Sequence, residues 1–161
     1  MIDQRQIREI ITDTLNALGP KYADPKAIDL IYNTGLVESK YVYLKQIKGP
    51  ARGYFQCESP TAVDICKNYL AYRKDLMKTV SEVCMLDWKY FLEPTEEDWE
   101  HILTSNLYAM ICMARIHYRR VPKPLPRTLE DQAIYWKAYY NTAKGKGTAE
   151  HFAEIVSKYG G

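Results

Sequence analysis

The chain has no long apolar run. No stretch approaches the roughly 18 consecutive apolar residues that a membrane-spanning helix needs. Residues 1–6 are polar and carry charges of both signs, so they lack the charged-then-apolar layout of a secretory signal peptide. We therefore expect neither a membrane span nor an export signal.

An excess of charge of one sign is also lacking. The chain has 22 Lys and Arg against 20 Asp and Glu, a net charge of +2. Bulk charge therefore does not favour nucleic acid or a membrane surface as a partner. A local exception is five basic residues within thirteen: Arg115, Arg119, Arg120, Lys123 and Arg127. Such a cluster is usually a solvated helix end and loop, and the alternative is a module that binds nucleic acid or protein.

Cysteine and histidine are few and scattered. The four cysteines form no C-x-x-C pair, and their spacings of 9, 18 and 28 residues match no metal-binding framework. The three histidines are equally dispersed. We expect reduced, mostly buried thiols, no metal site and no cofactor.

Phenylalanine is scarce, at 3 residues, whereas tyrosine numbers 14. Tyrosine combines an apolar ring with a polar tip, and a chain that uses it repeatedly often lines a wet groove with it.

What the sequence does have is helical periodicity almost throughout, with apolar residues repeating every three or four positions. Capping residues and Pro or Gly stops delimit helices over about 7–18, 25–38, 60–70, 76–84, 96–119, 129–139 and 149–156. The pattern predicts a mainly α fold in one domain, 1–161, with an N-terminal helix in 1–23.

Residues 39–58 interrupt this pattern. They are rich in Tyr, Lys and Gly, and Gly49-Pro50 and Gly53 would break a helix. We expect a loop or a small β element here, and a loop of this length in a compact domain usually carries function.

Glu38 closes the second expected helix. It follows Ile31 by seven residues and Ala27 by eleven, which on a helix places it within about 20° of both. The carboxyl should then lie along the apolar stripe, where its pKa rises and suits a general acid. A solvated glutamate at a frayed helix end is the alternative, and position alone does not decide between them.

The residues that follow add a motif. Glu38-Ser39 precedes Gly53-Tyr54-Phe55-Gln56 and Pro60-Thr61-Ala62, at offsets of 15, 18 and 23 residues from the glutamate to the glycine, glutamine and threonine. Tyr140-Asn141 comes later, before Ala143-Lys144-Gly145. In order and spacing, over about residues 25–158, the chain resembles the soluble lytic transglycosylase family of the lysozyme-like superfamily. It departs from that family at Lys40-Tyr41-Val42-Tyr43, at Tyr54-Phe55 and at the Ala143-Lys144-Gly145 turn.

The resemblance implies a single lysozyme-like α+β domain with a small loop or β element after the glutamate. Its catalytic core would be residues 24–161, and it would act on peptidoglycan glycan strands. Glu38 would be the single acid/base that cuts the bond between N-acetylmuramic acid and N-acetylglucosamine and leaves a 1,6-anhydro end. Gly53 would let the loop backbone approach the sugar. The other residues that match family positions near the glutamate and the sugar are Ser39, Gln56, Tyr140 and Asn141. Tyr54 departs from the family residue and is expected to bind substrate as one of the cleft tyrosines. Five tyrosines would line the cleft: Tyr41, Tyr43, Tyr54, Tyr139 and Tyr140.

Two alternatives stay open. Hydrolytic glycosidases usually use two carboxylates, and no Asp or Glu lies between Glu38 and Gln56. Glu58 follows Gln56 by two residues, and if it faces the cleft it could position a water and make the protein a lysozyme-type hydrolase. The chain could also be a virion structural protein with a lysozyme-like fold and little catalysis.

The lack of an export signal favours a bacteriophage-encoded protein. We expect an endolysin, made in the host cytoplasm and then acting in the periplasm or cell wall, or a virion-associated enzyme with other virion proteins as partners.

Overall fold

The computed structural model describes residues 1–142 and 145–160, and most of them are helical. The α-helices are α1 (Gln4–Leu18), α2 (Pro25–Ser39), α3 (Ser59–Asn68), α4 (Lys74–Cys84), α5 (Lys89–Leu92), α6 (Glu96–Ser105), α7 (Leu107–Arg119), α8 (Leu129–Trp136) and α9 (Ala149–Tyr159). Two 3₁₀ turns, η1 (Pro20–Tyr22) and η2 (Leu70–Tyr72), and a π-helical turn, η3 (Lys137–Asn141), complete them. The prediction of a mainly helical fold is confirmed.

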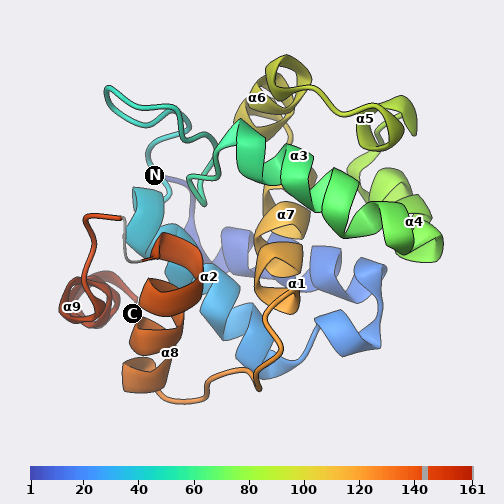
Figure 1. The fold of residues 1–161 in the computed structure, drawn as a ribbon. Coiled ribbons are helices and arrows are strands. Elements are labelled where there is room, and N and C mark those ends of the chain that lie inside the picture. The colour runs from blue at the N-terminus through green and yellow to red at the C-terminus, as the bar shows by residue number, and fades with distance from the viewer. Residues whose placement is uncertain (143–144, 161) are drawn as a thin grey trace.

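Helix α7 lies at the centre of the molecule (Figure 1). It contacts α1, α2, α3, α4 and α6. Every residue from Ala109 to Ile116 is buried, so this part of the helix has no face exposed to solvent. A helix that is buried on all sides and mostly apolar is stable only in such a central position.

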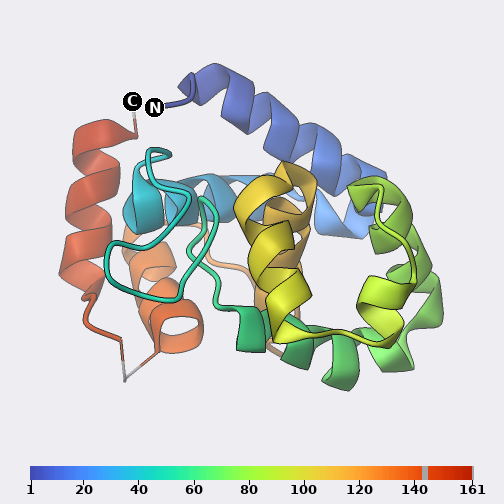
Figure 2. The same ribbon diagram turned by 90° about the horizontal axis from the view of Figure 1, so that it is seen from above.

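Helix α1 belongs to the same core. It packs on α2, α4 and α7 through the fully buried Ile7, Ile11 and Leu15. Its first turn lies beside the end of α9, where the Gln4 amide Nε2 donates to the Tyr159 carbonyl at 2.8 Å (Figure 2). The expected N-terminal helix is therefore present as α1, and it packs on the same core as the other helices.

Four of the described helices start at capping residues that the sequence predicts. The side chains of Asp24, Thr95, Thr128 and Thr148 each accept a hydrogen bond from a backbone N–H in the first turn of α2, α6, α8 and α9. These oxygens satisfy donors that a helix leaves without intrahelical partners.

The prediction of a single helix over 96–119 is wrong, because this segment forms two helices, α6 and α7. The chain breaks at Asn106, whose φ of −110° and ψ of 100° are not helical. Its Oδ1 accepts from the Ala109 N–H at 3.0 Å and its Nδ2 donates to the Cys84 carbonyl at 3.0 Å. Asn106 therefore caps α7 and ties the α6–α7 corner to the end of α4.

The β element after Glu38 is reduced to two isolated antiparallel bridges in the described part of the chain. Arg52 pairs with Lys45 on one side and with Cys57 on the other. The segment is a compact loop, which is one of the two forms expected for residues 39–58, and the α+β detail of the expected fold is not confirmed. In the described ranges, no helix is long and apolar enough to cross a membrane.

Candidate active site

Glu38 lies in the last turn of α2, beyond the buried Ala27 and Ile31 of the same stripe. The helix ends at Ser39 and is capped by Lys40, which adopts the left-handed conformation with φ of 53°. The stripe leaves the core at this point and the loop begins, so the Glu38 carboxyl sits where apolar packing meets an open surface.

The indole of Trp136 holds this carboxyl in place. Trp136 Nε1 donates to Glu38 Oε2 at 2.9 Å. Trp136 ends α8 and is buried against Phe152 of α9, with 5.4 Å between the two ring centroids. The packing of α8 on α9 therefore fixes the donor that orients the glutamate.

Burial raises the pKa of Glu38 to about 7, and the Trp136 hydrogen bond offsets part of the rise. Burial removes much of the water around the carboxyl, which disfavours its anion, whereas an N–H donor favours the anion. Near neutral pH the group thus exists in both forms, as a group that gives and then takes back a proton requires.

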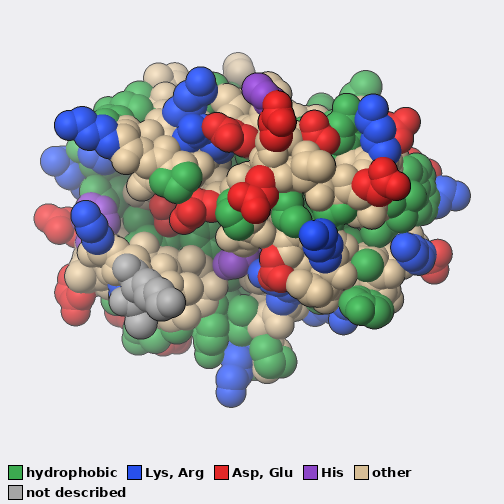
Figure 3. Space-filling model, turned by 45° about the horizontal axis from the view of Figure 1, so that its top comes forward, with side chains coloured by type: hydrophobic (Ala, Val, Ile, Leu, Met, Phe, Trp, Pro, Cys, Tyr) green, Lys and Arg blue, Asp and Glu red, His purple; other side chains and the backbone are tan. Residues whose placement is uncertain are grey.

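Glu38 opens into a cleft of about 600 Å³. Its walls come from the end of α2, the loop, the α8–η3 segment and residues 145–151. The lining residues are Val37, Glu38, Tyr43, Gln46, Ile47, Ala51, Gln56, Glu58, Trp136, Tyr140, Asn141, Gly145, Lys146, Gly147 and His151. Figure 3 views the molecule from its top and front and shows acidic side chains in a hollow of that face, with basic ones around them.

Ser39 does not reach the cleft. Its hydroxyl is buried, donates to the Tyr54 carbonyl at 2.7 Å and accepts from the Tyr41 N–H at 3.0 Å. The Tyr54 ring packs edge-on against Tyr41, with 5.5 Å between centroids, and does not line the cleft. Ser39 and Tyr54 thus anchor the loop to the end of α2.

Gly53 faces the interior. Its φ is +79°, and a Cβ there would lie 2.6 Å from the Leu103 carbonyl oxygen and 2.9 Å from Met110 Cγ. The sequence predicted that Gly53 lets the loop backbone approach a sugar, and the structure gives this glycine a different role. The glycine lets the loop pack against α6 and α7 in a conformation that side chains disfavour.

Gln56 does line the cleft. It is a non-glycine residue at positive φ, 50°, and its amide Nε2 donates to the Gly53 carbonyl at 2.8 Å. A residue held in this sparsely populated region is typical of a constrained functional segment.

The second motif reaches the cleft from η3. The Tyr140 hydroxyl donates to the Phe55 carbonyl at 2.6 Å, which joins η3 to the loop. The Asn141 Oδ1 accepts from Lys137 Nζ at 2.8 Å, and the same ammonium donates to the Gly145 carbonyl at 3.0 Å. Ala143 and Lys144 of the expected turn lie outside the described residues.

Glu58 is exposed at the start of α3 and lines the same cleft as Glu38. A small pocket of about 80 Å³ lies behind it and shares Gln56, Glu58 and Tyr140 with the cleft. His117 lies in that pocket, and burial lowers its pKa to about 4, with nearby Arg120 adding to the shift. The imidazole is therefore neutral near pH 7.

The tyrosines divide between cleft and core. Of the five expected in the cleft, Tyr43 and Tyr140 line it. Tyr41 is fully buried and its hydroxyl donates to the Tyr32 carbonyl at 2.7 Å. Tyr139 packs on Tyr135, with 4.9 Å between the two ring centroids. Among the cleft residues that the sequence reasoning missed, Trp136 is the one that bonds to Glu38. Its signal was its place four residues before Tyr140 on the same helical path.

The basic cluster of 115–127 is not one surface. Arg115 is 2% exposed, and its Nε donates to the Tyr22 carbonyl at 3.0 Å. Arg119 and Arg120 lie on a groove distinct from the one that Lys123 and Arg127 border. Within the described ranges, no group of three or more His, Cys, Asp and Glu side chains could hold a metal ion.

Comparison of the chain with protein-family models, with curated proteins and with solved structures found no match in any of the three.

Proposed function

We propose that this protein is a lytic transglycosylase that cuts the glycan strands of peptidoglycan with Glu38 as its single acid/base. One observation carries the proposal: a carboxyl with a pKa of about 7 lies in an open cleft and is oriented by an indole N–H. The motif that starts at Glu38 supplies the choice of substrate, through its resemblance to the soluble lytic transglycosylase family.

The chemistry needs one proton carrier. Protonated Glu38 gives its proton to the oxygen of the bond between N-acetylmuramic acid and N-acetylglucosamine, and the C1–O bond breaks. The Glu38 carboxylate then takes the proton of the muramoyl 6-hydroxyl while that oxygen bonds to C1. The products are a free 4-hydroxyl and a 1,6-anhydro end, and Glu38 is returned to its acid form.

Other cleft residues have binding roles in this proposal. Tyr43 and Tyr140 offer rings for the sugar faces, and Gln56 and Asn141 offer amides for hydroxyl and acetamido groups. Trp136 keeps the carboxyl in one orientation, so the proton is delivered in one direction.

Digestion of purified sacculi tests the proposal. Wild-type protein should release muropeptides with anhydro ends, identified by mass, and Glu38→Gln should release none. Glu9→Gln, on the exposed side of α1, removes a carboxyl outside the cleft and should cleave like wild type. Absence of release by folded wild-type protein from sacculi of several wall types would refute enzymatic activity and favour a structural role in a virion.

One observation favours a second candidate, a lysozyme-type hydrolase. Glu58 shares the cleft with Glu38 and could hold a water for attack on C1, which would add a second carboxylate. The same digestion separates the two candidates. Reducing ends that are lost in Glu58→Gln would indicate hydrolysis, whereas anhydro ends that persist in Glu58→Gln indicate the transglycosylase.

A further inference from the structure

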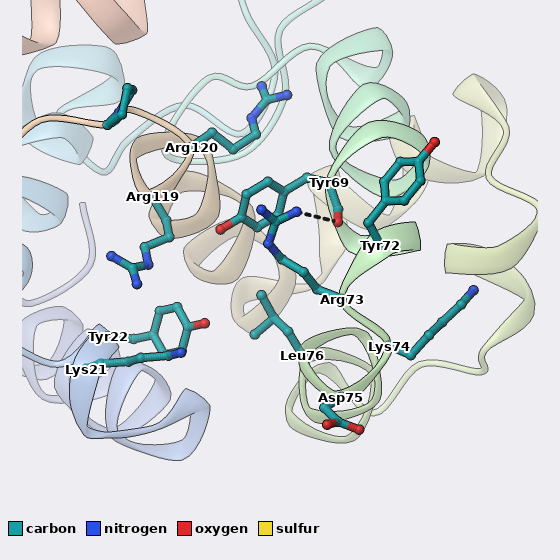
Figure 4. Close-up of a pocket in the computed structure, with 11 residues that line it drawn as sticks. Lys21, Tyr22, Tyr69, Tyr72, Arg73, Lys74, Asp75, Leu76, Arg119 and Arg120 are labelled. Atoms are coloured by element: carbon teal, nitrogen blue, oxygen red, sulfur yellow. Dashed lines mark hydrogen bonds between the residues drawn. The ribbon is translucent and has the colours of Figure 1, made fainter.

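A second hollow of about 680 Å³ lies between η1, the η2–α4 segment and the end of α7 (Figure 4). It shares no lining residue with the Glu38 cleft. The proposed glycan-cleaving chemistry uses none of its side chains.

Positive charge dominates this groove. Its lining holds one acid, Asp75, and five basic residues, which are Lys21, Arg73, Lys74, Arg119 and Arg120. Arg120 is paired with Asp64 at 2.7 Å. No salt bridge in the described part of the chain involves any of the other four.

A structural role explains only part of this charge. Cations at the end of a helix offset its dipole, which accounts for Arg119 and Arg120 at the end of α7. Lys21 comes from η1, and Arg73 and Lys74 from the start of α4. The dipole disfavours cations at the start of a helix, so the interaction of Lys74 with the dipole of α4 is unfavourable.

Tyrosine rings accompany the cations. The Arg73 guanidinium lies over the Tyr69 ring, 3.7 Å from its centroid, and donates to the Tyr69 carbonyl at 3.1 Å (Figure 4). Lys21 and Arg119 lie 5.5 and 5.8 Å from the centroid of the Tyr22 ring. A cation that lies over a ring face keeps N–H groups of its own that can bind an anion.

Among the described residues, the ring of one tyrosine in the groove, Tyr72, has no cation over it. Tyr72, at the rim of the groove, is 79% exposed and points away from Tyr69 (Figure 4). An exposed aromatic face beside a row of unpaired cations is the arrangement by which proteins bind single-stranded nucleic acid: phosphates follow the cations and a base stacks on the ring.

We propose that this groove binds a single strand of DNA or RNA. The phosphates would lie along Lys21, Arg73, Lys74 and Arg119, and a base would stack on Tyr72. A chain of phosphates without bases would use the cations but gain nothing from Tyr72. A rigid duplex keeps its bases stacked away from the ring, and a concave site suits it less than a flexible strand.

Fluorescence anisotropy with a labelled thymidine dodecamer tests the proposal. We expect binding in the micromolar range at low salt. Three to four neutralised phosphates on a single strand give a salt slope of about −2 to −3, so a fourfold rise in salt should weaken binding by about thirtyfold. No salt-dependent binding would overturn the proposal.

Matched variants locate the site. Lys21→Glu with Lys74→Glu reverses two exposed charges of the groove and should weaken binding by about tenfold or more. Arg5→Glu with Lys158→Glu reverses two exposed charges at the opposite end of α1, where α9 ends, and should weaken it far less. Equal losses in the two double variants would contradict binding in the groove.

The aromatic contact has its own controls. Tyr72→Ala should weaken binding by about tenfold, whereas Tyr108→Ala, which removes another exposed tyrosine, should leave it unchanged. Inorganic polyphosphate of similar length should compete poorly, and so should a duplex of the same length. Equal competition by either would overturn the assignment to a single strand. Glu38→Gln should bind the oligonucleotide like wild type, which separates this proposal from the enzymatic one.

Discussion

The hydrogen bond between Trp136 and Glu38 joins residues 98 positions apart in the chain. Trp136→Phe keeps most of the buried ring and removes the donor. Because that donor holds the pKa of Glu38 down, the pKa should rise further above its usual range, and the alkaline limb of the activity profile should move to higher pH.

Trp99→Phe is the matched control. The Trp99 indole donates to the Tyr90 carbonyl at 2.9 Å, away from the cleft. Each variant should lose about 1 to 3 kcal/mol of stability in urea unfolding, because each leaves a buried acceptor with one partner fewer. Only Trp136→Phe should change the pH profile, and an identical shift in Trp99→Phe would contradict the role of Trp136.

The ionisation of Glu38 also predicts how stability depends on pH. The folded pKa of about 7 lies above the usual 4.5, so between these values the folded chain keeps a proton that the unfolded chain has lost. The contribution of Glu38 to stability is therefore complete below about pH 4.5 and is lost as pH rises to about 7.

Glu38→Gln removes this dependence. The free energy of unfolding of the variant, relative to wild type, should rise by about 2 to 3 kcal/mol between pH 4.5 and 7.5 and stay level above. Denaturant titrations at a series of pH values measure it. A flat difference for Glu38→Gln would mean that its carboxyl titrates normally.

Sequence reasoning found Glu38 and missed Trp136 for a physical reason. Helical periodicity shows which face of a helix is buried, and that was enough to place Glu38 beside Ala27 and Ile31. It does not show which distant helix supplies the neighbour. The contact exists because α8 packs on α9 and both lie beside α2, which only the tertiary structure shows.

At the scale of elements, the loop after α2 depends on Gly53. Gly53→Ala places a methyl group 2.6 Å from a backbone oxygen at a φ that side chains disfavour. We expect a loss of about 2 to 4 kcal/mol in urea unfolding. Gly49→Ala is the comparison, because its new methyl meets only the flexible end of Gln46 and should cost less. Equal small effects would mean that the loop can shift freely.

The α6–α7 corner depends on Asn106 in a similar way. Asn106→Ala removes the cap of α7 and the bond to the Cys84 carbonyl, and should cost about 2 to 3 kcal/mol. Thr128→Ala removes only the cap of α8 and should cost about 1 kcal/mol. Equal losses, measured by urea unfolding, would show that the bond to α4 contributes nothing.

The sequence located most helices because their caps are local. Asp24, Thr95, Thr128 and Thr148 bond to N–H groups two or three residues away, so each start can be predicted from a few residues. Helical periodicity does not show the break at Asn106, because apolar spacing continues across it, although the family resemblance places the start of a central helix there. The asparagine bends the chain by bonding to α4, 22 residues earlier, which no local pattern reveals.

At the scale of the whole molecule, the cleft and the basic groove are built from different elements. The cleft uses the end of α2, the loop and α8–η3, whereas the groove uses η1, η2–α4 and the end of α7. The near-neutral net charge concealed the groove, because its cations come from three separate parts of the sequence.

The opposite pKa shifts of Glu38 and His117 have a consequence for folding itself. At about pH 5.5, the unfolded chain carries a proton on most His117 imidazoles, whose usual pKa is 6.5, and on few Glu38 carboxyls, whose usual pKa is 4.5. The folded chain reverses this, with His117 near 4 and Glu38 near 7. Folding in mild acid therefore moves about one proton from a base to an acid, and these two groups exchange almost none with the buffer.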